Sequence, residues 1–269
     1  MRGEAVNEAA GNSGLPALRA LREDAPQYSI SLMHYLEYTC STAAENLAWE
    51  EALLRHAEEC DGPELLRLWE LDQPAVVLGA GGCVAAEVCQ ERCQEDGIPI
   101  LRRASGGGTV LLGPGCLCFS LVLRYDRAPW LHDIRRSFVY VLERIIAALA
   151  PEVRLEIQGS DLTVGDRKVS GNAQQRKRRY FLHHGTLLYA VQSADYARYL
   201  LPPPRQPAYR RHRPHQHFVT NLPLSAAELR RRLIQAWEAN EPFDPRPLWS
   251  HVQQLMLEKY TQSAWHLRL

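Results

Sequence analysis

The chain has 269 residues, of which 46% are hydrophobic and 23% charged, and this balance is typical of a globular protein with an ample core. No apolar run approaches about 20 residues, which excludes a membrane-spanning helix, and the N-terminus lacks the basic and apolar regions of a secretory signal. The seven cysteines are an odd number without a CxxC pair, so we expect free thiols and a cytoplasmic protein.

The first half of the chain predicts a tail, two helices and several short strands. Residues 1–29 are rich in Ala, Glu, Gly and Pro without periodicity, so we expect a loose tail there and one domain over residues 30–269. Apolar residues recur near helical spacing over residues 42–59 and predict an amphipathic helix. A second helix, over residues 85–95, interrupts strand-like runs at residues 65–71, 75–79, 98–103, 109–112 and 117–123.

The second half predicts a long helix over residues 132–150, a further β region and two closing helices at residues 225–239 and 247–261. The segment 201–214 carries five prolines and is expected to be irregular. Short turns between the runs favour antiparallel hairpins. We therefore predict an α+β fold, with a mixed, mostly antiparallel β-sheet flanked by helices. Strands of the further β region are predicted at residues 153–157, 162–164, 168–173 and 180–190.

Three consecutive glycines, Gly106 to Gly108, lie between two apolar runs in the segment LRRASGGGTVLLGPGC. Glycines allow backbone with positive φ and a close approach to a ligand, although a plain glycine hairpin between strands has the same pattern. A second signal is the scarcity of lysine, because only three of the 31 basic residues are lysines. Lys168, directly after an arginine, indicates a need for a compact ammonium, with surface charge as the alternative.

Five ordered motifs resemble the lipoate protein ligase family, which belongs to the biotinyl/lipoyl transferase superfamily. The resemblance covers the chain from about residue 36 onward, and it implies a catalytic domain with the biotinyl/lipoyl protein ligase-like, class II synthetase-like fold. The motifs are RRASGGGTV from Arg102, SDLTVGDRKVSGNA from Ser160, HHGTLL from His183, PAYRRHRPHQHFVTNL from Pro207 and LEKYTQSAW from Leu257.

The resemblance implies a two-step reaction that uses ATP and Mg²⁺. The carboxylate of lipoate or octanoate attacks the α-phosphate of ATP, and a lysine of a lipoyl domain then attacks the acyl adenylate. The acceptor would be the E2 subunit of a 2-oxoacid dehydrogenase or the glycine cleavage H protein. Lys168 would be catalytic, holding the acyl carbonyl and α-phosphate, and Asp161 would lie near the magnesium. The other residues implied at the substrate or adenylate are Arg103, Ser105, Gly106, Gly107, Gly108, Thr109, Ser170, Gly171, Ala173 and His184.

The chain departs from the family pattern after the glycines, where LLGPGC resembles the octanoyl transferases more closely. Those enzymes use no ATP and carry a nucleophilic cysteine. Cys116 is the candidate nucleophile for this alternative, and a small core residue is its other interpretation. The transferases carry their nucleophile later in the chain, yet no cysteine follows Cys118, which favours the ligase. A non-catalytic binding protein on the same fold is the second alternative.

Larger ligases of this family carry a C-terminal accessory domain. The present chain ends soon after its Lys259-Tyr260 pair, so we expect no such domain here, and a separate accessory chain is one way to supply it. The acyl tail needs an apolar slot, for which we expect the runs around Val77, Val110 and Leu121.

Between residues 167 and 213, eleven lysines and arginines face a single acid, Asp195. This predicts a basic face that is either solvated or docks an acidic lipoyl domain. Nucleic acid is a weaker alternative, because no recognisable RNA or DNA motif accompanies the charge. His183 and His184 are neighbours on a predicted strand and must face opposite sides. We expect His184 to face the site.

Overall fold

Strand β6 (Cys116–Arg124) is buried along nearly its whole length, as expected for the central strand of a sheet with two covered faces. In the computed structural model, which describes residues 32–268, β6 pairs antiparallel with β2 on one side and β10 on the other. The expected tail at residues 1–29 lies outside the described residues.

The large sheet has eight strands in the order β11-β1-β2-β6-β10-β9-β8-β7. Strands β11, β1 and β2 run parallel, and every other neighbouring pair is antiparallel. The predicted α+β fold with a mostly antiparallel sheet is therefore confirmed. Its strands are β1 (Met33–Glu37), β2 (Leu65–Trp69), β6 (Cys116–Arg124), β7 (Glu156–Gln158), β8 (Asp161–Val164), β9 (Arg167–Arg176), β10 (Tyr180–Leu188) and β11 (Ala239–Pro242).

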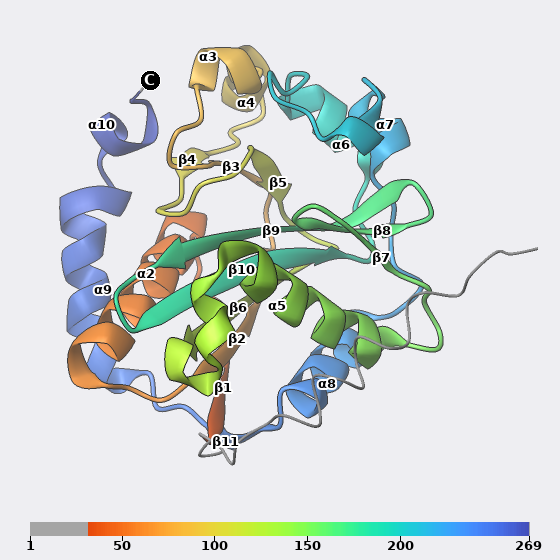
Figure 1. The fold of residues 1–269 in the computed structure, drawn as a ribbon. Helices are drawn as coiled ribbons and strands as arrows, with labels where there is room; N and C mark the ends of the chain where they lie inside the picture. The colour runs from red at the N-terminus through yellow and green to blue at the C-terminus, as the bar shows by residue number, and fades with distance from the viewer. Residues whose placement is uncertain (1–31, 269) are drawn as a thin grey trace, which may run out of the picture. The chain divides into compact units, whose positions relative to one another are not determined.

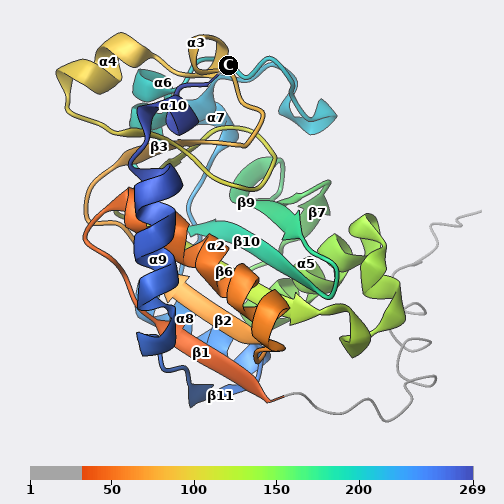
Figure 2. The ribbon, with the colours of Figure 1, turned by 90° about the vertical axis from the view of Figure 1, so that its left-hand side faces the viewer.

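Alternate residues of β6 belong to two different cores. Cys116, Cys118 and Val122 pack with helix α2 (Ala43–Cys60) and with a second, smaller sheet. Leu117, Phe119, Leu121 and Leu123 pack on the opposite face with helices α5 and α8. Figure 1 shows α5 and α8 in front of the large sheet and α2 behind it, and Figure 2 shows α2 beside α9.

The small sheet consists of β3 (Ala75–Leu78), flanked by β4 (Ile100–Arg102) in parallel and β5 (Val110–Leu112) in antiparallel orientation. The predicted hairpin of β2 with β3 is wrong, because β2 pairs with β1 and β6 in the large sheet. The chain passes from the large sheet to the small sheet between β2 and β3. The small sheet therefore packs on the same side of the large sheet as α2. The space between these layers becomes the cavity described below.

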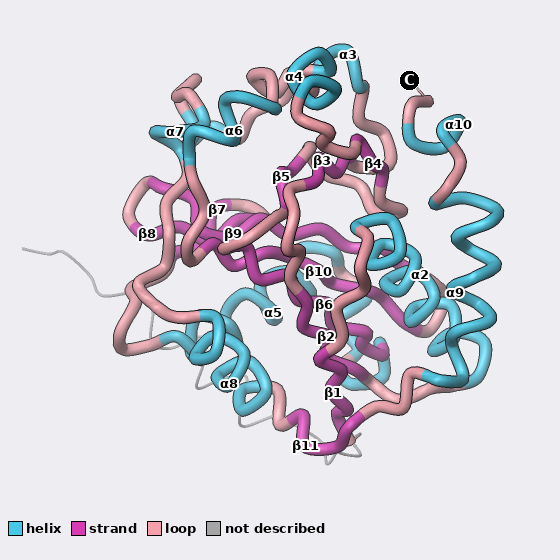
Figure 3. Tube along the Cα trace, turned by 180° about the vertical axis from the view of Figure 1, so that it is seen from behind, coloured by secondary structure: helices cyan, strands magenta, loops and turns pink. Residues whose placement is uncertain are grey.

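Helices surround these two sheets. Figure 3 shows α6 beside α7, and α10 beside β4. Within residues 32–268, no helix has the length and apolar character that crossing a bilayer requires. The α-helices are α2 (Ala43–Cys60), α3 (Val84–Glu87), α4 (Gln90–Glu95), α5 (Ile134–Leu149), α6 (Ser193–Tyr199), α7 (His215–Phe218), α8 (Ala226–Ala236), α9 (Trp249–Leu255) and α10 (Ser263–His266).

Several predicted boundaries change for identifiable reasons. The single helix expected at residues 85–95 is two short helices, because Val88 has extended backbone and pairs with Leu200. The last predicted helix divides into α9 and a π-helical turn, Met256–Tyr260. The strand expected at residues 153–157 is displaced to β7. Helix α2 is less amphipathic than predicted, because Asn46, Glu50 and Glu51 are all buried in it.

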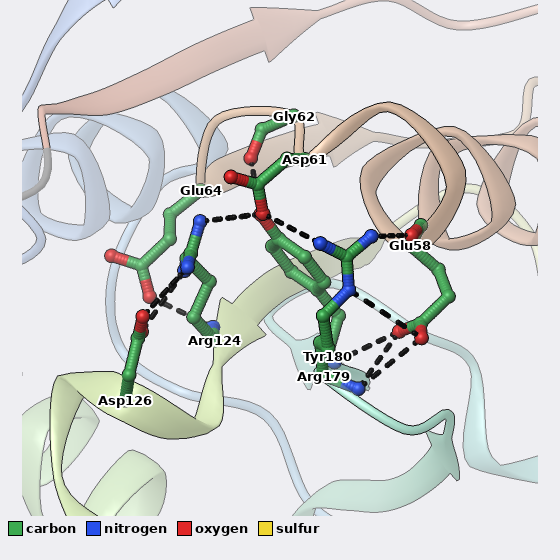
Figure 4. Close-up of polar contacts among 8 residues, drawn as sticks. All are labelled: Glu58, Asp61, Gly62, Glu64, Arg124, Asp126, Arg179 and Tyr180. Carbon is green, nitrogen blue, oxygen red and sulfur yellow. Dashed lines mark hydrogen bonds and ion pairs between the residues drawn. The ribbon is translucent and has the colours of Figure 1, made fainter.

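The C-terminal end of α2 is joined to the turn between β9 and β10 by a network of polar contacts (Figure 4). Asp61 accepts hydrogen bonds from Arg124 at 2.8 Å and from Arg179 at 3.0 Å. Glu58 accepts the backbone N–H groups of Arg179 and Tyr180 at 3.0 and 3.1 Å. The network fixes a turn that the sequence marks only by its basic residues.

Local ion pairs neutralise part of the predicted basic face. Arg179, Arg198 and Arg213 pair with acids that lie far from them in the sequence, namely Asp61, Asp96 and Asp166. Arg210 is buried, with its guanidinium 4.6 Å from the ring of Phe218. Much of the positive charge of residues 167–213 is thus neutralised or covered locally.

Candidate active site

A cavity of about 140 Å³ lies between the α2 face of the large sheet and the small sheet. Its wall is apolar toward α2, β2 and β3 and polar toward β8 and β9. Such a shape suits a ligand with an apolar tail and a charged head. Among the described residues its lining is Leu47, Glu50, Trp69, Val77, Arg103, Gly107, Gly108, Thr109, Val110, Leu112, Cys118, Ser160, Asp161, Lys168, Gly171, Asn172, Ala173, His184, Gly185 and Thr186.

Arg103 organises the glycine loop, residues 105–109, at the end of β4. Its guanidinium donates to the Ser105 hydroxyl at 3.0 Å and to the carbonyls of Gly106 and Gly108 at 2.5 and 2.9 Å. Gly107 has a φ of +90°, which glycine adopts readily. Burial lowers the pKa of Arg103 to about 10, so the side chain stays charged at neutral pH. The loop is held from inside by one buried cation.

The loop also rests on two supports that sequence reasoning missed. A Cβ at Gly79 would lie 2.0 Å from the carbonyl oxygen of Gly107, so only glycine fits beneath the loop. Glu87 of α3 accepts the Thr109 hydroxyl at 2.7 Å and the backbone N–H of Cys83 at 3.0 Å. The only feature of the sequence that could have indicated a role for Glu87 is that it is a carboxylate in a mostly apolar stretch.

Lys168 and Asp161 lie on the paired strands β9 and β8, across the cavity from the glycine loop. The Lys168 ammonium is 2.9 Å from Asp161 Oδ1, and Asp161 Oδ2 accepts the hydroxyl of Tyr209 at 2.6 Å. A Cβ at Gly171 would lie 2.7 Å from Lys168 Nζ. The Lys168 side chain thus crosses closely over Gly171, and the residue contributes to the cavity lining.

A second polar chain runs from the glycine loop to α2. Ser105 Oγ lies 2.6 Å from His184 Nε2, and His184 Nδ1 lies 2.7 Å from Glu50 Oε2. The other Glu50 oxygen accepts the hydroxyl of Ser120 at 2.5 Å. Ser105 Oγ accepts from Arg103 and shares a second hydrogen bond with His184 Nε2, while the other ring nitrogen of His184 faces Glu50. His184 is thereby fixed in the cavity wall.

Sequence reasoning treated Glu50 as a polar residue on an amphipathic helix. A usable signal was present, because Leu47, Glu50 and Leu54 follow the i, i+3, i+7 spacing of one helix face. A carboxylate on a buried stripe needs partners. Burial raises the pKa of Glu50, but His184, Ser120 and Arg67 together lower it by more than burial raises it. The net pKa therefore lies below the ordinary value of 4.5.

Glu50→Gln is expected to weaken the pH dependence of stability in mild acid. Because the folded pKa of Glu50 is depressed, its contribution is present above pH 4.5 and is lost as the pH falls through the folded pKa. Urea unfolding at pH 6 and pH 4 should therefore show a smaller loss of stability for Glu50→Gln than for the wild type. Equal losses in the two proteins would contradict this assignment.

The structure brings most of the predicted site residues to one cavity. Ser105, Gly106 and Ser170 are the exceptions, because they are not part of its lining. Ser170 is fully buried and accepts a hydrogen bond from Asn172 at 3.0 Å. His184 lines the cavity, on the expected side, while His183 is buried in the opposite core and stacks on Phe119. Burial lowers the pKa of His183 to about 3, so it is neutral.

One expectation about the cavity wall is wrong. Leu121 does not line it, because the alternation along β6 turns Leu121 toward α5 and α8. Cys116 is 1% exposed and packs in the core, as its interpretation as a small core residue predicts, whereas Cys118 lines the cavity. Burial, with Cys116 adjacent, raises the pKa of the Cys118 thiol well above its usual range. Trp69, Leu47 and Leu112 complete the apolar side instead.

The residues present do not fit a metal held by the protein. Within residues 32–268, no three His, Cys, Asp or Glu side chains gather as a metal site. Asp161 is the carboxylate at the polar end, and both of its oxygens are already engaged, one in an ion pair with Lys168 and the other in a hydrogen bond from Tyr209. A magnesium ion requires free oxygen ligands.

Residues 42–238 match the model of the lipoyl protein ligase A/B catalytic domain. The chain belongs to this family. Among relatives of the lipoyl protein ligase family, the lipoate-protein ligase LplJ of Bacillus subtilis is 34% identical over 146 residues, 54% of this chain and 42% of the relative. A putative lipoate-protein ligase A of Aeropyrum pernix is 32% identical over 157 residues, 58% of each chain. The chain thus spans about half of the length of these two relatives.

Solved structures show the same fold as this member of the lipoyl protein ligase family. A chain of the archaeal lipoylation system of Thermoplasma acidophilum, described as a bi-partite lipoate protein ligase and its E2 lipoyl domain, superposes with a TM-score of 0.76 at 22% identity, covering 88% of this chain and 96% of that one. A lipoate-protein ligase A bound with ATP gives a TM-score of 0.74 at 22% identity, with coverages of 88% and 98%.

Proposed function

We propose that this chain is an enzyme, the catalytic domain of an ATP-dependent lipoate protein ligase. The observation that carries the proposal is the placement of Lys168 opposite the glycine loop, across a cavity with one apolar and one polar end. The apolar wall of Leu47, Trp69 and Val77 suits the acyl chain of lipoate or octanoate. The polar end suits the carboxylate and the phosphates of ATP.

In the first step, the acyl carboxylate attacks the α-phosphate of ATP and pyrophosphate leaves. Negative charge grows on the phosphate oxygens, and the Lys168 ammonium lies where it can stabilise that charge. Arg103 and the glycine loop hold the head of the substrate, because the backbone at Gly106 and Gly108 is open on the side where a Cβ would lie. Magnesium, when it arrives with the nucleotide, would supply further charge neutralisation.

In the second step, the amine of an acceptor lysine attacks the acyl carbonyl and AMP leaves. Lys168 can stabilise the developing oxyanion in this step as well, because the same carbonyl lies beside the same phosphate. We propose a lipoyl domain as the acceptor. A T. acidophilum ligase with this fold is described together with its E2 lipoyl domain, and the glycine cleavage H protein is a second candidate.

The proposal is tested by pyrophosphate release from purified protein supplied with ATP, magnesium and lipoate. Release that depends on lipoate, followed by lipoylation of an added apo lipoyl domain, is the expected result. Absence of release together with transfer from octanoyl carrier protein would overturn adenylation and favour the transferase alternative. If neither pyrophosphate release nor acyl transfer is detected, the protein should be assayed again together with a separate accessory chain.

The transferase alternative requires a thiolate, and β6 carries two cysteines, of which Cys118 lines the cavity. Both are buried, and burial raises the pKa of Cys118, which opposes thiolate formation. We expect Cys116→Ala and Cys118→Ala each to retain lipoylation activity within about threefold. A loss of several hundredfold in either variant, with the fold intact, would identify a nucleophile and contradict the ligase mechanism.

A further inference from the structure

Both carboxylate oxygens of Asp161 are committed in the ligand-free structure. Oδ1 lies 2.9 Å from Lys168 Nζ, and Oδ2 accepts the Tyr209 hydroxyl at 2.6 Å. Asp161 is 7% exposed, so water competes little for either contact. Tyr209 is not among the described residues that line the cavity. Its hydroxyl therefore acts on the cavity only through Asp161.

The residues around Tyr209 form a tightly fixed turn, residues 207–213, which we name the Tyr209 turn. Arg211 and His212 follow one another with φ values of 52° and 57°, a left-handed backbone that is uncommon outside glycine. Arg210 and Arg213 stabilise it by donating to each other's carbonyl oxygens at 3.1 and 3.0 Å. Because these contacts hold the backbone of the Tyr209 turn, the direction of the Tyr209 side chain is fixed as well.

The same part of the chain is tied to the strand that carries Lys168. The backbone N–H of Thr220 donates to the Lys168 carbonyl at 2.8 Å, and Arg213 donates to Asp166 in the turn between β8 and β9 at 2.7 Å. The ring of Tyr209 packs on Phe218, with centroids 5.2 Å apart. The chain on both sides of Tyr209 is therefore held in place, and so is the ring that carries the hydroxyl toward Asp161.

The hydroxyl is a permanent donor. Burial, followed by the charge of Asp161, raises the pKa of Tyr209 well above its usual range. The phenol stays protonated at any pH at which the protein works, and its hydrogen bond to a carboxylate belongs to the stronger, charge-assisted class. A protonated phenol on Oδ2 keeps the carboxylate plane fixed, so Oδ1 stays directed at the lysine.

We propose that Tyr209 is a positioning residue, whose hydroxyl holds Asp161 as the fixed counter-ion of Lys168 and so aims the lysine amine at the acyl phosphate. The proposal rests on the proposed adenylation. Asp161 then serves the reaction as an orienting group, in place of the magnesium contact that the sequence implied. The phenol does not contact the substrate in this arrangement.

Tyr209→Phe tests the proposal, because it removes the hydroxyl and keeps the ring on Phe218. In lipoate-dependent pyrophosphate release, we expect kcat to fall about tenfold or more, the loss expected for one hydrogen bond to a charged group. KM for ATP and for lipoate should stay within about twofold, since the hydroxyl does not line the cavity. The magnesium concentration that gives half of the maximal rate should be unchanged.

Tyr199→Phe is a matched control, because Tyr199 makes the same kind of contact elsewhere. Its hydroxyl donates to Asp96 Oδ2 at 2.9 Å, and Arg198 completes the group as the cation. This variant should keep kcat within about twofold. Equal losses in Tyr199→Phe and Tyr209→Phe would overturn the positioning role, as would an unchanged kcat in Tyr209→Phe.

Two further outcomes would also overturn the proposal. A raised KM for ATP with an unchanged kcat would mean that the phenol contacts the nucleotide directly. A lowered magnesium requirement in Tyr209→Phe would mean that the phenol competes with a metal for Asp161. Either result would assign a different role to the same contact.

Amide hydrogen exchange on the ligand-free protein separates this inference from the proposed function. If the hydroxyl fixes the Tyr209 turn on Asp161, exchange of the backbone amides of residues 208–213 should become at least about tenfold faster in Tyr209→Phe than in the wild type. Unchanged exchange would overturn the anchoring contact. A wild-type protein that releases no pyrophosphate would instead refute the adenylation reaction, while the exchange result would still stand.

Discussion

Lys168→Ala is expected to lower the rate of lipoate-dependent pyrophosphate release by about 10²–10³-fold, the cost of removing one charged donor from a developing anion. The Lys168 side chain is 23% exposed and makes a single ion pair, with Asp161, so its removal should leave the fold intact. Thermal unfolding and circular dichroism of the variant would verify this.

Lys177→Ala is the matched control, because Lys177 is an exposed lysine in the turn between β9 and β10 and should have no effect on rate. Lys168→Arg should not restore activity, since the guanidinium fork needs more room than the ammonium that lies over Gly171. Full activity in Lys168→Ala would refute the site. The alternative of a non-catalytic binding protein is excluded if the wild type forms the adenylate. It is excluded at this site if a folded Lys168→Ala protein then still binds lipoate but forms no adenylate.

Arg102→Met is expected to lower the free energy of unfolding by about 3 kcal/mol or more, because several buried carbonyl groups lose their donor together. Arg102 is fully buried. It donates to the carbonyls of Gly79 at 3.1 Å and Gly82 at 2.6 Å on one side, and to those of Trp265 at 3.1 Å and His266 at 3.0 Å on the other. Methionine fills similar space without any donor.

Urea unfolding followed by circular dichroism would measure the effect. Arg92→Met is the control, since Arg92 forms an exposed pair with Glu95 at 2.6 Å and such pairs contribute about 0–1 kcal/mol. A difference of less than about 1 kcal/mol between the two variants would contradict the importance of Arg102.

The sequence carries the fold class and most of the cavity, because glycine and apolar alternation leave local signals. Gly107 adopts the positive φ that a run of three glycines favours, and the run at residues 117–123, apolar except for Ser120, is a strand with two covered faces. Lys168 was noticeable because lysine is so scarce here. Each of these features can be read from a few neighbouring residues.

The parts that were missed depend on contacts between distant segments. Tyr209 meets Asp161 across 48 positions, and His184 meets Glu50 across 134. Strands β1 and β11 form a parallel pair, and neither segment alternates clearly enough to predict it. The basic residues of 167–213 looked like one surface because their acidic partners lie elsewhere in the chain. Long-range pairing decides such features, and a single sequence does not encode it locally.

Arg102, the last residue of β4, points toward α10, whereas Arg103, which follows it, points toward the glycine loop. The C-terminal partners of Arg102 lie 163 to 166 positions further along the chain. A nascent polypeptide still on the ribosome therefore carries a complete glycine motif without the segment that holds its supporting strand. The glycine motif should therefore reach its final structure late in synthesis, when residues 265–268 are available to hold β4.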